Sequence, residues 1–294
     1  MTGKTPRRER SAPSRTPLVP EIPSLAIVIV SYNVAHELDG CLRSLVGQTE
    51  PFSTAIVVVD NGSQDGTVQM VRDRWRAVRV IETGDNLGFA RATNVGIRAT
   101  YGDYVLLMNP DTITRPGAIP ALVRELESHP EAAIAGPRLV DEAGVAELSF
   151  GWSIGPFGEL LQKIVGGLYR RSSKAVVHRV ERWTRETGER EWVSGACLLA
   201  RRVDLEAVNL LDERYFMYTE DVDLCVQLRH RGRTIRFVAD AEVVHLRGRS
   251  AARNPRTEQL RRRSQLAYYA KHHPAWLPLL KAYLRLTGKN ASAE

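Results

Sequence analysis

Short, almost wholly apolar segments that alternate with amphipathic stretches constrain the fold of this chain more than any other feature. Four such segments lie in its first part, at residues 25–30, 55–59, 78–81 and 104–108. They are rich in Val, Ile and Leu, as expected of strands that are buried on both faces. The stretches between them carry apolar residues at helical spacing, at 36–46, 65–75 and 89–100. This alternation predicts an α/β fold, a mainly parallel sheet flanked by helices.

The remaining sequence divides into segments of different character. The first 24 residues hold five of the 15 prolines and no apolar period, which predicts a disordered basic tail. Beyond an irregular stretch at 151–191, we expect strands at 193–200, 235–238 and 241–245, and helices at 222–231 and 257–288. We therefore predict a catalytic domain over 25–250 and a basic, amphipathic helical extension over 251–294.

Cysteine usage and hydropathy restrict the cellular setting. The three cysteines lie far apart and form no CxxC pair, which excludes a disulfide scaffold and a cysteine-based zinc site. A membrane-spanning helix needs about 20 apolar residues, and every apolar run in this chain is much shorter. No apolar segment typical of a signal peptide follows the basic N-terminus. These features predict a cytoplasmic protein that is not integral to a membrane.

The positive charge is concentrated near the C-terminal end. Of the net charge of +7, residues 246–290 alone contribute eleven Lys or Arg against one acid. Such a segment suits an anionic membrane or a nucleic acid. Its apolar residues recur at helical steps and predict an interfacial helix: Trp276, Leu279, Leu280, Tyr283 and Leu284. The alternative is that this face packs back onto the catalytic domain.

Polar clusters follow three of the predicted strands. They are the segments 31–33, 60–63 and 109–111. Each taken alone fits a helix cap or a turn. Because parallel strands end at one edge of a sheet, where ligands of open α/β sheets bind, the three together indicate a binding site.

These clusters belong to longer motifs that identify a family. The motifs VSYN (30–33), VVDNGS (58–63), NLGFARATN (86–94), LLMNPD (106–111) and DERYFMYTEDVDL (212–224) resemble those of family-2 glycosyltransferases with the GT-A fold. The last motif is similar to the rhamnosyltransferase-like branch. All five occur in the family's order and cover about residues 25–250. The resemblance implies an inverting, metal-dependent glycosyltransferase that uses a nucleotide sugar.

The resemblance also assigns residues to the donor site. It implies that the donor is held by one set of polar positions: Ser31, Tyr32, Asn33, Asp60, Asn86, Arg91, Asn94, Asn109 and Gly195. An aspartate can accept the imide N–H of uracil or thymine, so Asp60 suggests a UDP- or dTDP-linked sugar. Arg91 is suited to a diphosphate.

The family's metal-binding Asp-x-Asp is altered in this chain. Asn109 replaces the first carboxylate, and an amide oxygen is a weaker, neutral ligand for a hard cation. The resemblance leaves Asp111 as the direct ligand of Mg²⁺ or Mn²⁺, which would bridge the donor diphosphate. His245 matches a histidine that joins the metal site in related enzymes.

The pair Glu220 and Asp221 is the expected catalytic centre. Inverting transfer needs a base that removes the proton of the attacking hydroxyl, and Asp221 matches the family's base. Acidic residues also suit a helix N-terminus, which accounts for the acidity of this segment. It does not account for the aromatic run at 215–218, which suits either a sugar face or the core.

We therefore expect rhamnosyl transfer from dTDP-rhamnose to a glycan or lipid-linked cell-envelope acceptor, at or near the inner face of the membrane. Two alternatives stay open. A nucleotide-sugar synthesis enzyme would need a Gly-rich loop after the first strand, where this chain has SYNVA (31–35). A basic nucleic-acid-binding protein fits the charge, but no recognised motif accompanies it, so we expect no nucleic-acid partner. A dehydrogenase would need GxGxxG after the first strand, which is missing.

Overall fold

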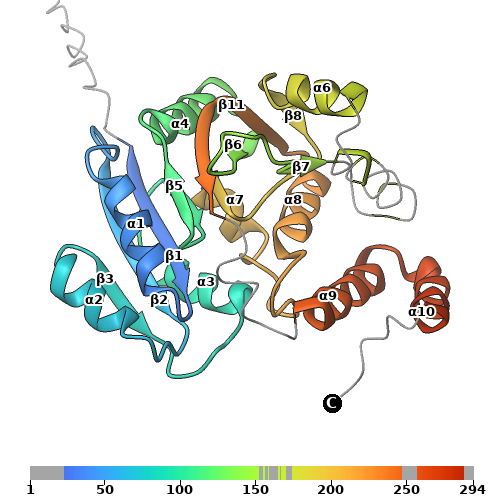
Figure 1. The fold of residues 1–294 in the computed structure, drawn as a ribbon, viewed down its shortest axis with the longest axis horizontal. Coiled ribbons are helices and arrows are strands. Elements are labelled where there is room, and N and C mark those ends of the chain that lie inside the picture. Colours follow the sequence, from blue (N-terminus) through green and yellow to red (C-terminus); the bar gives the residue numbers. More distant parts are fainter. Residues whose placement is uncertain are drawn as a thin grey trace, which may run out of the picture.

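A computed structural model describes residues 23–151, 174–246 and 257–287, together with a few positions between 155 and 169. The predicted N-terminal tail, apart from its last two residues, lies outside this part of the chain, as do residues 247–256 and 288–294. The α/β fold is confirmed: a central sheet has helices on both faces (Figure 1).

The main sheet consists of two groups of strands. The first group is parallel, in the order β3, β2, β1, β4, and comprises β1 (Ser24–Ser31), β2 (Ser53–Asp60), β3 (Arg79–Glu82) and β4 (Tyr104–Met108). The second group continues in mixed directions as β10 (Cys197–Arg201), β6 (Ala132–Val140), β11 (Thr234–His245) and β5 (Thr112–Thr114). β8 (Gly188–Arg190) pairs with β11, and β7 (Phe150–Gly151) pairs with β9 (Trp192–Val193) in a separate small sheet.

Alternate residues of the strands pack against opposite layers of helices. In β1, Ile27 and Ile29 face a core cluster shared with α1 (Ala35–Leu45), α2 (Thr67–Arg74) and α4 (Ala118–Ser128). Val28 and Val30 face a second cluster, shared with α3 (Phe89–Arg98), α7 (Arg202–Ala207) and α8 (Glu220–His230). Burial on both faces explains why these strands are apolar throughout. α6 (Lys174–Trp183) precedes β8.

The structure corrects several predicted boundaries. The strand expected at 193–200 is split into β9 and β10 by a turn at Gly195, and the two strands expected between 235 and 245 form one strand, β11. The register of β11 on β6 shifts between Val238 and Glu242, which explains the break in its apolar pattern. The segments that form β5, α4 and β6 were not predicted.

The helix expected at 257–288 is also interrupted. It forms α9 (Thr257–His272), a 3₁₀ turn at Pro274–Trp276 and α10 (Leu277–Leu286). Pro274 has no N–H to continue the hydrogen bonding of α9, so the helix ends before it. α9 lies against α8 and buries Tyr268 and Tyr269, whereas α10 lies farther out (Figure 1). Within the described residues, no helix is long and apolar enough to cross a bilayer.

Candidate active site

Two buried acceptor atoms mark the ends of β1 and β2. Ser31 and Asp60 are the last residues of these strands and face each other in the parallel register. Asp60 Oδ1 accepts a hydrogen bond from the Ser63 N–H at 2.9 Å. In the described part of the chain, neither Ser31 Oγ nor Asp60 Oδ2 has a hydrogen-bond partner, although both are buried. Buried polar atoms are normally paired, so this position is suited to a ligand that carries hydrogen-bond donors.

The loops after these strands are joined to each other. The Asn33 N–H donates to Ser63 Oγ at 2.9 Å, and Asn33 Oδ1 accepts from the Gln64 N–H at 2.7 Å. These bonds hold Asn33 at a positive φ of 53°. The neighbouring ring of Tyr32 is 45% exposed, so it is available to a ligand at this edge. The structure thus gives Asn33 a part in shaping the loop and leaves Tyr32 accessible.

The loop before α3 lies directly against the segment that precedes α8. Asn86 Oδ1 accepts from Asn61 Nδ2 at 2.9 Å and from the Gly88 N–H at 3.0 Å. Gly88 has a φ of 84°, and a Cβ there would lie 2.5 Å from the carbonyl oxygen of Phe216. The Phe89 N–H donates to the same oxygen at 2.6 Å. Gly88 is therefore needed for this close approach of two loops.

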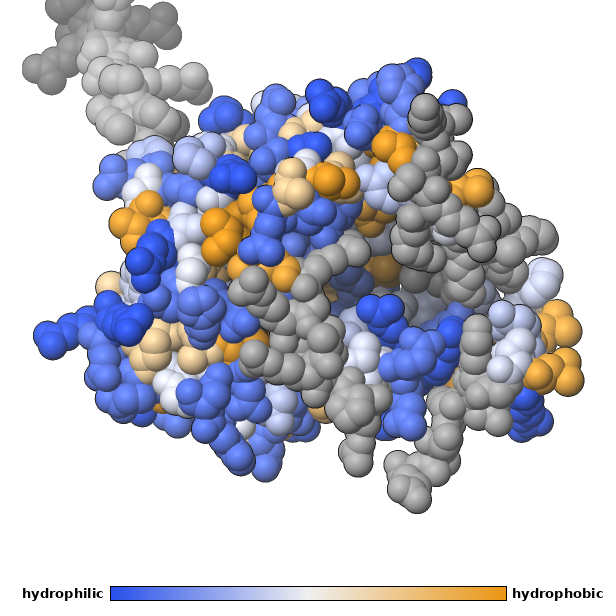
Figure 2. Space-filling view, in the orientation of Figure 1, coloured by the Kyte–Doolittle hydropathy of each residue, from blue (hydrophilic) through white to orange (hydrophobic). Residues whose placement is uncertain are grey.

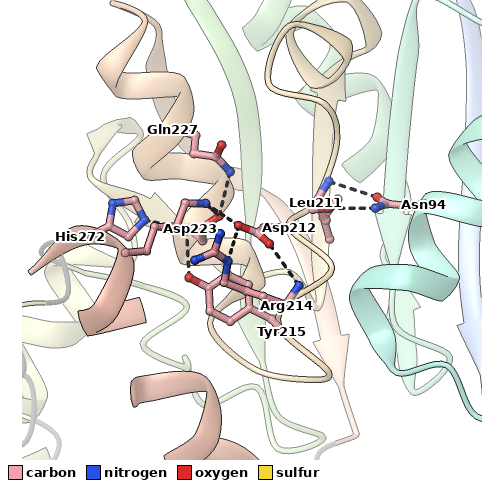
Figure 3. Close-up of polar contacts among 9 residues, drawn as sticks. Asn94, Leu211, Asp212, Arg214, Tyr215, Asp223, Gln227 and His272 are labelled. Atoms are coloured by element: carbon pink, nitrogen blue, oxygen red, sulfur yellow. Dashed lines mark hydrogen bonds and ion pairs between the residues drawn. The ribbon is translucent and has the colours of Figure 1, made fainter. Parts of the chain in front are cut away.

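Asn94 and Arg91 lie on successive turns of α3 but differ in their surroundings. Asn94 is fully buried, and its amide exchanges hydrogen bonds with the backbone of Leu211 at 2.8 and 3.1 Å (Figure 3). It also donates to Glu213 at 3.0 Å. Arg91 is exposed and lies 3.9 Å from the same carboxylate. Asn94 joins α3 to the loop before α8, while Arg91 lies at the solvent-exposed surface in a long ion pair.

At the end of β4, the sheet brings together Asp111 and His245. β5 pairs with β11 so that His245 lies opposite Thr112, and His245 Nε2 is 3.5 Å from Asp111 Oδ1. The other ring nitrogen lies 3.3 Å from Glu147 Oε2. Burial alone would lower the pKa of His245, but the two carboxylates raise it to about 9. Asn109 lies at the start of this turn, and its N–H donates to the Ala196 carbonyl at 2.8 Å.

This donor set fits a hard divalent cation, which would displace the proton that the two carboxylates favour on His245. A carboxylate oxygen and an imidazole nitrogen face one another, and Glu147 holds the far side of the imidazole, as carboxylates beside metal-binding histidines do. Among the residues described, no group of three His, Cys, Asp or Glu side chains is placed to hold a metal alone. Any cation here would need further ligands from a diphosphate or water. Sequence reasoning missed Glu147, because its loop has no periodic pattern. Its proximity to His245, at the end of β11, is seen only in the folded chain.

Asp221 lies at the start of α8, beside the turn that separates β9 from β10. Its Oδ2 accepts from the Gly195 N–H and its Oδ1 from the Val222 N–H, both at 2.8 Å. A Cβ on Gly195 would lie 3.0 Å from the Cβ of Asp221, so the glycine permits this contact. The next residue, Ala196, accepts the bond from Asn109. One short turn therefore connects Asp221 with the Asp111 site.

The two acids at this helix start differ from ordinary surface carboxylates. Burial raises the pKa of Asp221, although the hydrogen bonds from Gly195 and Val222 act in the opposite direction. Burial, and then the charge of Asp221, raise the pKa of Glu220 well above its usual value. Glu220 Oε2 is buried and has no hydrogen-bond partner in the described part of the structure. A carboxylate with a raised pKa is a better proton acceptor when ionised, as general-base chemistry requires.

Comparison with known proteins gives concordant results. Residues 26–206 match the family model described as "Glycosyl transferase family 2". An N-acetylglucosaminyl-diphospho-decaprenol L-rhamnosyltransferase of Mycobacterium tuberculosis is 34% identical over 267 residues, 86% of each chain. A rhamnosyltransferase of Escherichia coli is 25% identical over 74% of this chain and 82% of its own. Among solved structures, a mannosyltransferase from Pyrobaculum calidifontis in complex with GDP-Man and Mn²⁺ has a TM-score of 0.61 at 18% identity, covering 90% of this chain and 70% of that one.

Proposed function

This chain belongs to glycosyl transferase family 2 and is a rhamnosyltransferase-like glycosyltransferase with the GT-A fold, and we propose that it moves rhamnose from dTDP-rhamnose to a lipid-linked acceptor. The acceptor proposal takes its chemistry from the M. tuberculosis relative, whose name specifies a diphospho-decaprenol-linked sugar. One observation carries the proposal. Ser31, Asp60 and Asn109 follow one another along the same edge of the sheet, and the Ser194–Ala196 turn connects Asn109 with Asp221.

The nucleotide would bind at the ends of β1 and β2. The buried acceptor Asp60 Oδ2 is suited to the N3–H of thymine or uracil, and Ser31 Oγ can serve a second polar atom of the base. Tyr32 would provide an exposed ring, and Arg91 would bind the diphosphate. We propose a supporting role for Asn33, Asn86 and Asn94, because their amides bind neighbouring loops.

Asp111 and His245 would hold Mg²⁺ or Mn²⁺, with Asn109 at the edge of the site. When bound, the cation would neutralise charge on the departing nucleoside diphosphate. Glu147 would orient His245 through its other nitrogen.

Asp221 would act as the general base of an inverting reaction. It would take the proton of the acceptor hydroxyl as that oxygen attacks the anomeric carbon on the face opposite the leaving diphosphate. The bond between the anomeric carbon and the diphosphate oxygen breaks as the new glycosidic bond forms. The Gly195 and Val222 N–H groups would fix the carboxylate of Asp221 in this role.

A lipid-linked acceptor lies in a membrane, so the enzyme must act at the membrane surface. We propose that α10 contacts this surface. Trp276 and three further apolar residues recur at three- and four-residue steps and are exposed, with exposed fractions of 61% at Leu279, 48% at Tyr283 and 88% at Leu286. At the right-hand edge of Figure 2, where α10 lies in Figure 1, apolar residues are exposed beside hydrophilic ones. Lys281 and Arg285 are exposed on the same helix, which favours an anionic lipid surface. Leu280 and Leu284, expected on the same stripe, instead turn toward the protein.

The proposed arrangement is a catalytic domain over 25–250, with residues 251–294 as an extension that contacts the cytoplasmic face of the membrane. Liposome flotation tests this contact. Protein with Leu279, Tyr283 and Leu286 changed to Ser should float less with anionic vesicles than the unchanged protein. Val203→Ser, at an exposed apolar position on α7, is the matched control. Equal flotation of the triple variant and the control would contradict a membrane role for α10.

Donor identity can be tested by thermal shift with UDP-, dTDP- and GDP-sugars in the presence of Mn²⁺. We expect dTDP-rhamnose to raise the melting temperature most. In a separate activity assay, the enzyme should transfer rhamnose from it to a prenyl-diphosphate-linked N-acetylglucosamine. GDP-sugars are an informative comparison, because guanine also carries a ring N–H. Preferential stabilisation by a GDP-sugar would contradict the proposed donor.

A further inference from the structure

The backbone just before Asp221 is in a strained conformation. Tyr218 and Thr219 are consecutive non-glycine residues with φ values of 71° and 77°. Left-handed backbone is unfavourable for residues with a Cβ and persists only where the surroundings hold it. Because this turn leads directly into Glu220 and Asp221, whatever holds it also determines where the Asp221 carboxylate points.

Much of the support for this turn comes from α9. Ser264 Oγ donates to the carbonyl oxygen of Met217 at 2.7 Å. The guanidinium of Arg261 lies over the ring of Tyr218, 4.6 Å from its centroid. On the other side, the Phe89 N–H binds Phe216. The turn therefore lies between the start of α3 and α9, a helix more than forty residues farther along the chain.

A second set of contacts fixes the first turns of α8. Asp223 is fully buried two residues beyond Asp221, and it accepts hydrogen bonds from Tyr215 at 3.1 Å and from Gln227 at 2.8 Å. His272 Nε2 lies 2.6 Å from the same carboxylate (Figure 3). A buried carboxylate with this many partners is held in one orientation.

Lys271 connects both ends of the segment. Its Nζ donates to Asp212 Oδ2 at 2.7 Å and to Asp223 Oδ2 at 2.8 Å. Asp212 begins the motif that contains the strained turn, and Asp223 lies just beyond the turn. One ammonium group therefore closes the loop formed by residues 212–223, which we call the catalytic loop.

From these contacts, we propose that Lys271 and His272 of α9 are positioning residues for transfer: they close the catalytic loop and thereby aim Asp221 at the acceptor hydroxyl. The proposal rests on the proposed role of Asp221 as the base. Neither side chain is assigned a contact with donor or acceptor. Their loss should therefore slow the chemical step and leave donor binding almost unchanged.

The decisive variant is Lys271→Met, which keeps the length of the side chain and removes its charge. We expect kcat to fall by about 10²-fold, the typical effect of a small misplacement of a reacting group. The dissociation constant of the donor, measured by calorimetry, should change by less than about twofold. Lys271→Arg should restore part of kcat, because a guanidinium can still bridge two carboxylates.

Three further variants separate positioning from simple destabilisation. Arg124→Met likewise replaces a cation by Met, at an exposed position of α4 that has no assigned role, and should leave kcat unchanged. Gln227→Met removes one hydrogen bond from Asp223 without opening the catalytic loop. It should therefore lower the melting temperature and leave kcat almost unchanged. If Lys271→Met does not fold, Ser264→Ala tests the same idea, with an expected loss in kcat of about fivefold for one hydrogen bond.

The double variant of Lys271→Met with Asp221→Asn shows where Lys271 acts. If Lys271 works through Asp221, the double variant should be no slower than Asp221→Asn alone. If Lys271→Met lowered kcat by the same factor in the wild type and in Asp221→Asn, the positioning role would be overturned. An unchanged kcat in Lys271→Met, at a temperature where the protein is folded, would also overturn it. Wild-type turnover in Asp221→Asn alone would instead overturn the proposed base.

Discussion

The proposed donor end of the site, where β1 and β2 finish, and the catalytic loop are built in different ways. At the donor end, Ser31 and Asp60 are the last residues of neighbouring strands, and the sheet register alone brings them together. In the catalytic loop, Asp221 depends on the Gly195 turn, on Phe89 and on α9, which are distant in sequence. Pairing of neighbouring strands thus forms the proposed donor end, whereas the catalytic loop depends on contacts among several separate elements.

This difference predicts that the two regions can be disabled separately. Changes in the catalytic loop should reduce turnover and spare donor binding. Changes at the strand ends should reduce donor binding first. The predictions below test that separation in order of decreasing expected effect.

The largest effect should follow Asp221→Asn. We expect kcat to fall by about 10²–10⁴-fold, the usual contribution of a general base. Donor affinity should stay nearly constant, because the strand ends are untouched. Steady-state kinetics together with calorimetry on the purified variant would measure both quantities. Wild-type-like turnover would show that Asp221 is not the base, and that the catalytic loop does not control turnover as the comparison predicts.

Asp111→Ala should weaken donor binding. Asp111 is the only carboxylate in the 109–111 turn, so no neighbour in that turn can replace it. We expect affinity for the donor with Mn²⁺ to fall by about 10²-fold. Calorimetry with and without the cation distinguishes loss of metal-dependent binding from general loss. Unchanged affinity in the presence of metal would show that the metal assignment is wrong.

A smaller effect is expected from Glu147→Gln. The amide keeps the shape of the side chain but removes the charge that lies 3.3 Å from His245 Nδ1. Loss of such a supporting carboxylate weakens metal binding by about tenfold. A titration of donor binding against Mn²⁺ concentration would measure the shift. Glu142→Gln, on the same segment, provides a control for the charge change alone.

The smallest effect concerns stability. Burial raises the pKa of Glu220 in the folded chain above its value in the unfolded chain. Its contribution to stability is therefore present below the unfolded pKa and is lost as the pH rises through the folded pKa. Glu220→Gln cannot ionise, so it should be more stable than the wild type on the alkaline side and similar to it in acid. Urea denaturation over a pH series measures this, and an effect of opposite sign would contradict the burial argument.

The limits of sequence reasoning follow the same division. The polar clusters at 31–33, 60–63 and 109–111 could be predicted to meet, because each directly follows an apolar strand. The motif around Asp221 was recognisable by resemblance. Glu147 and Lys271 carried no local signal, since one lies in an aperiodic loop and the other resembles any basic residue of a surface helix. Their roles come from the register of β11 and from the packing of α9 on α8.

The bridge made by Lys271 also has a consequence for the order in which activity arises during biosynthesis. A nascent chain that has emerged only as far as the end of β11 already contains every residue assigned to donor, metal and base. It still lacks the ammonium that joins Asp212 to Asp223. Such a chain would engage a nucleotide sugar before it could transfer the sugar productively. On the proposed role of Lys271, transfer would begin only after synthesis has passed residue 272, and α10 with its exposed apolar residues would emerge immediately afterwards.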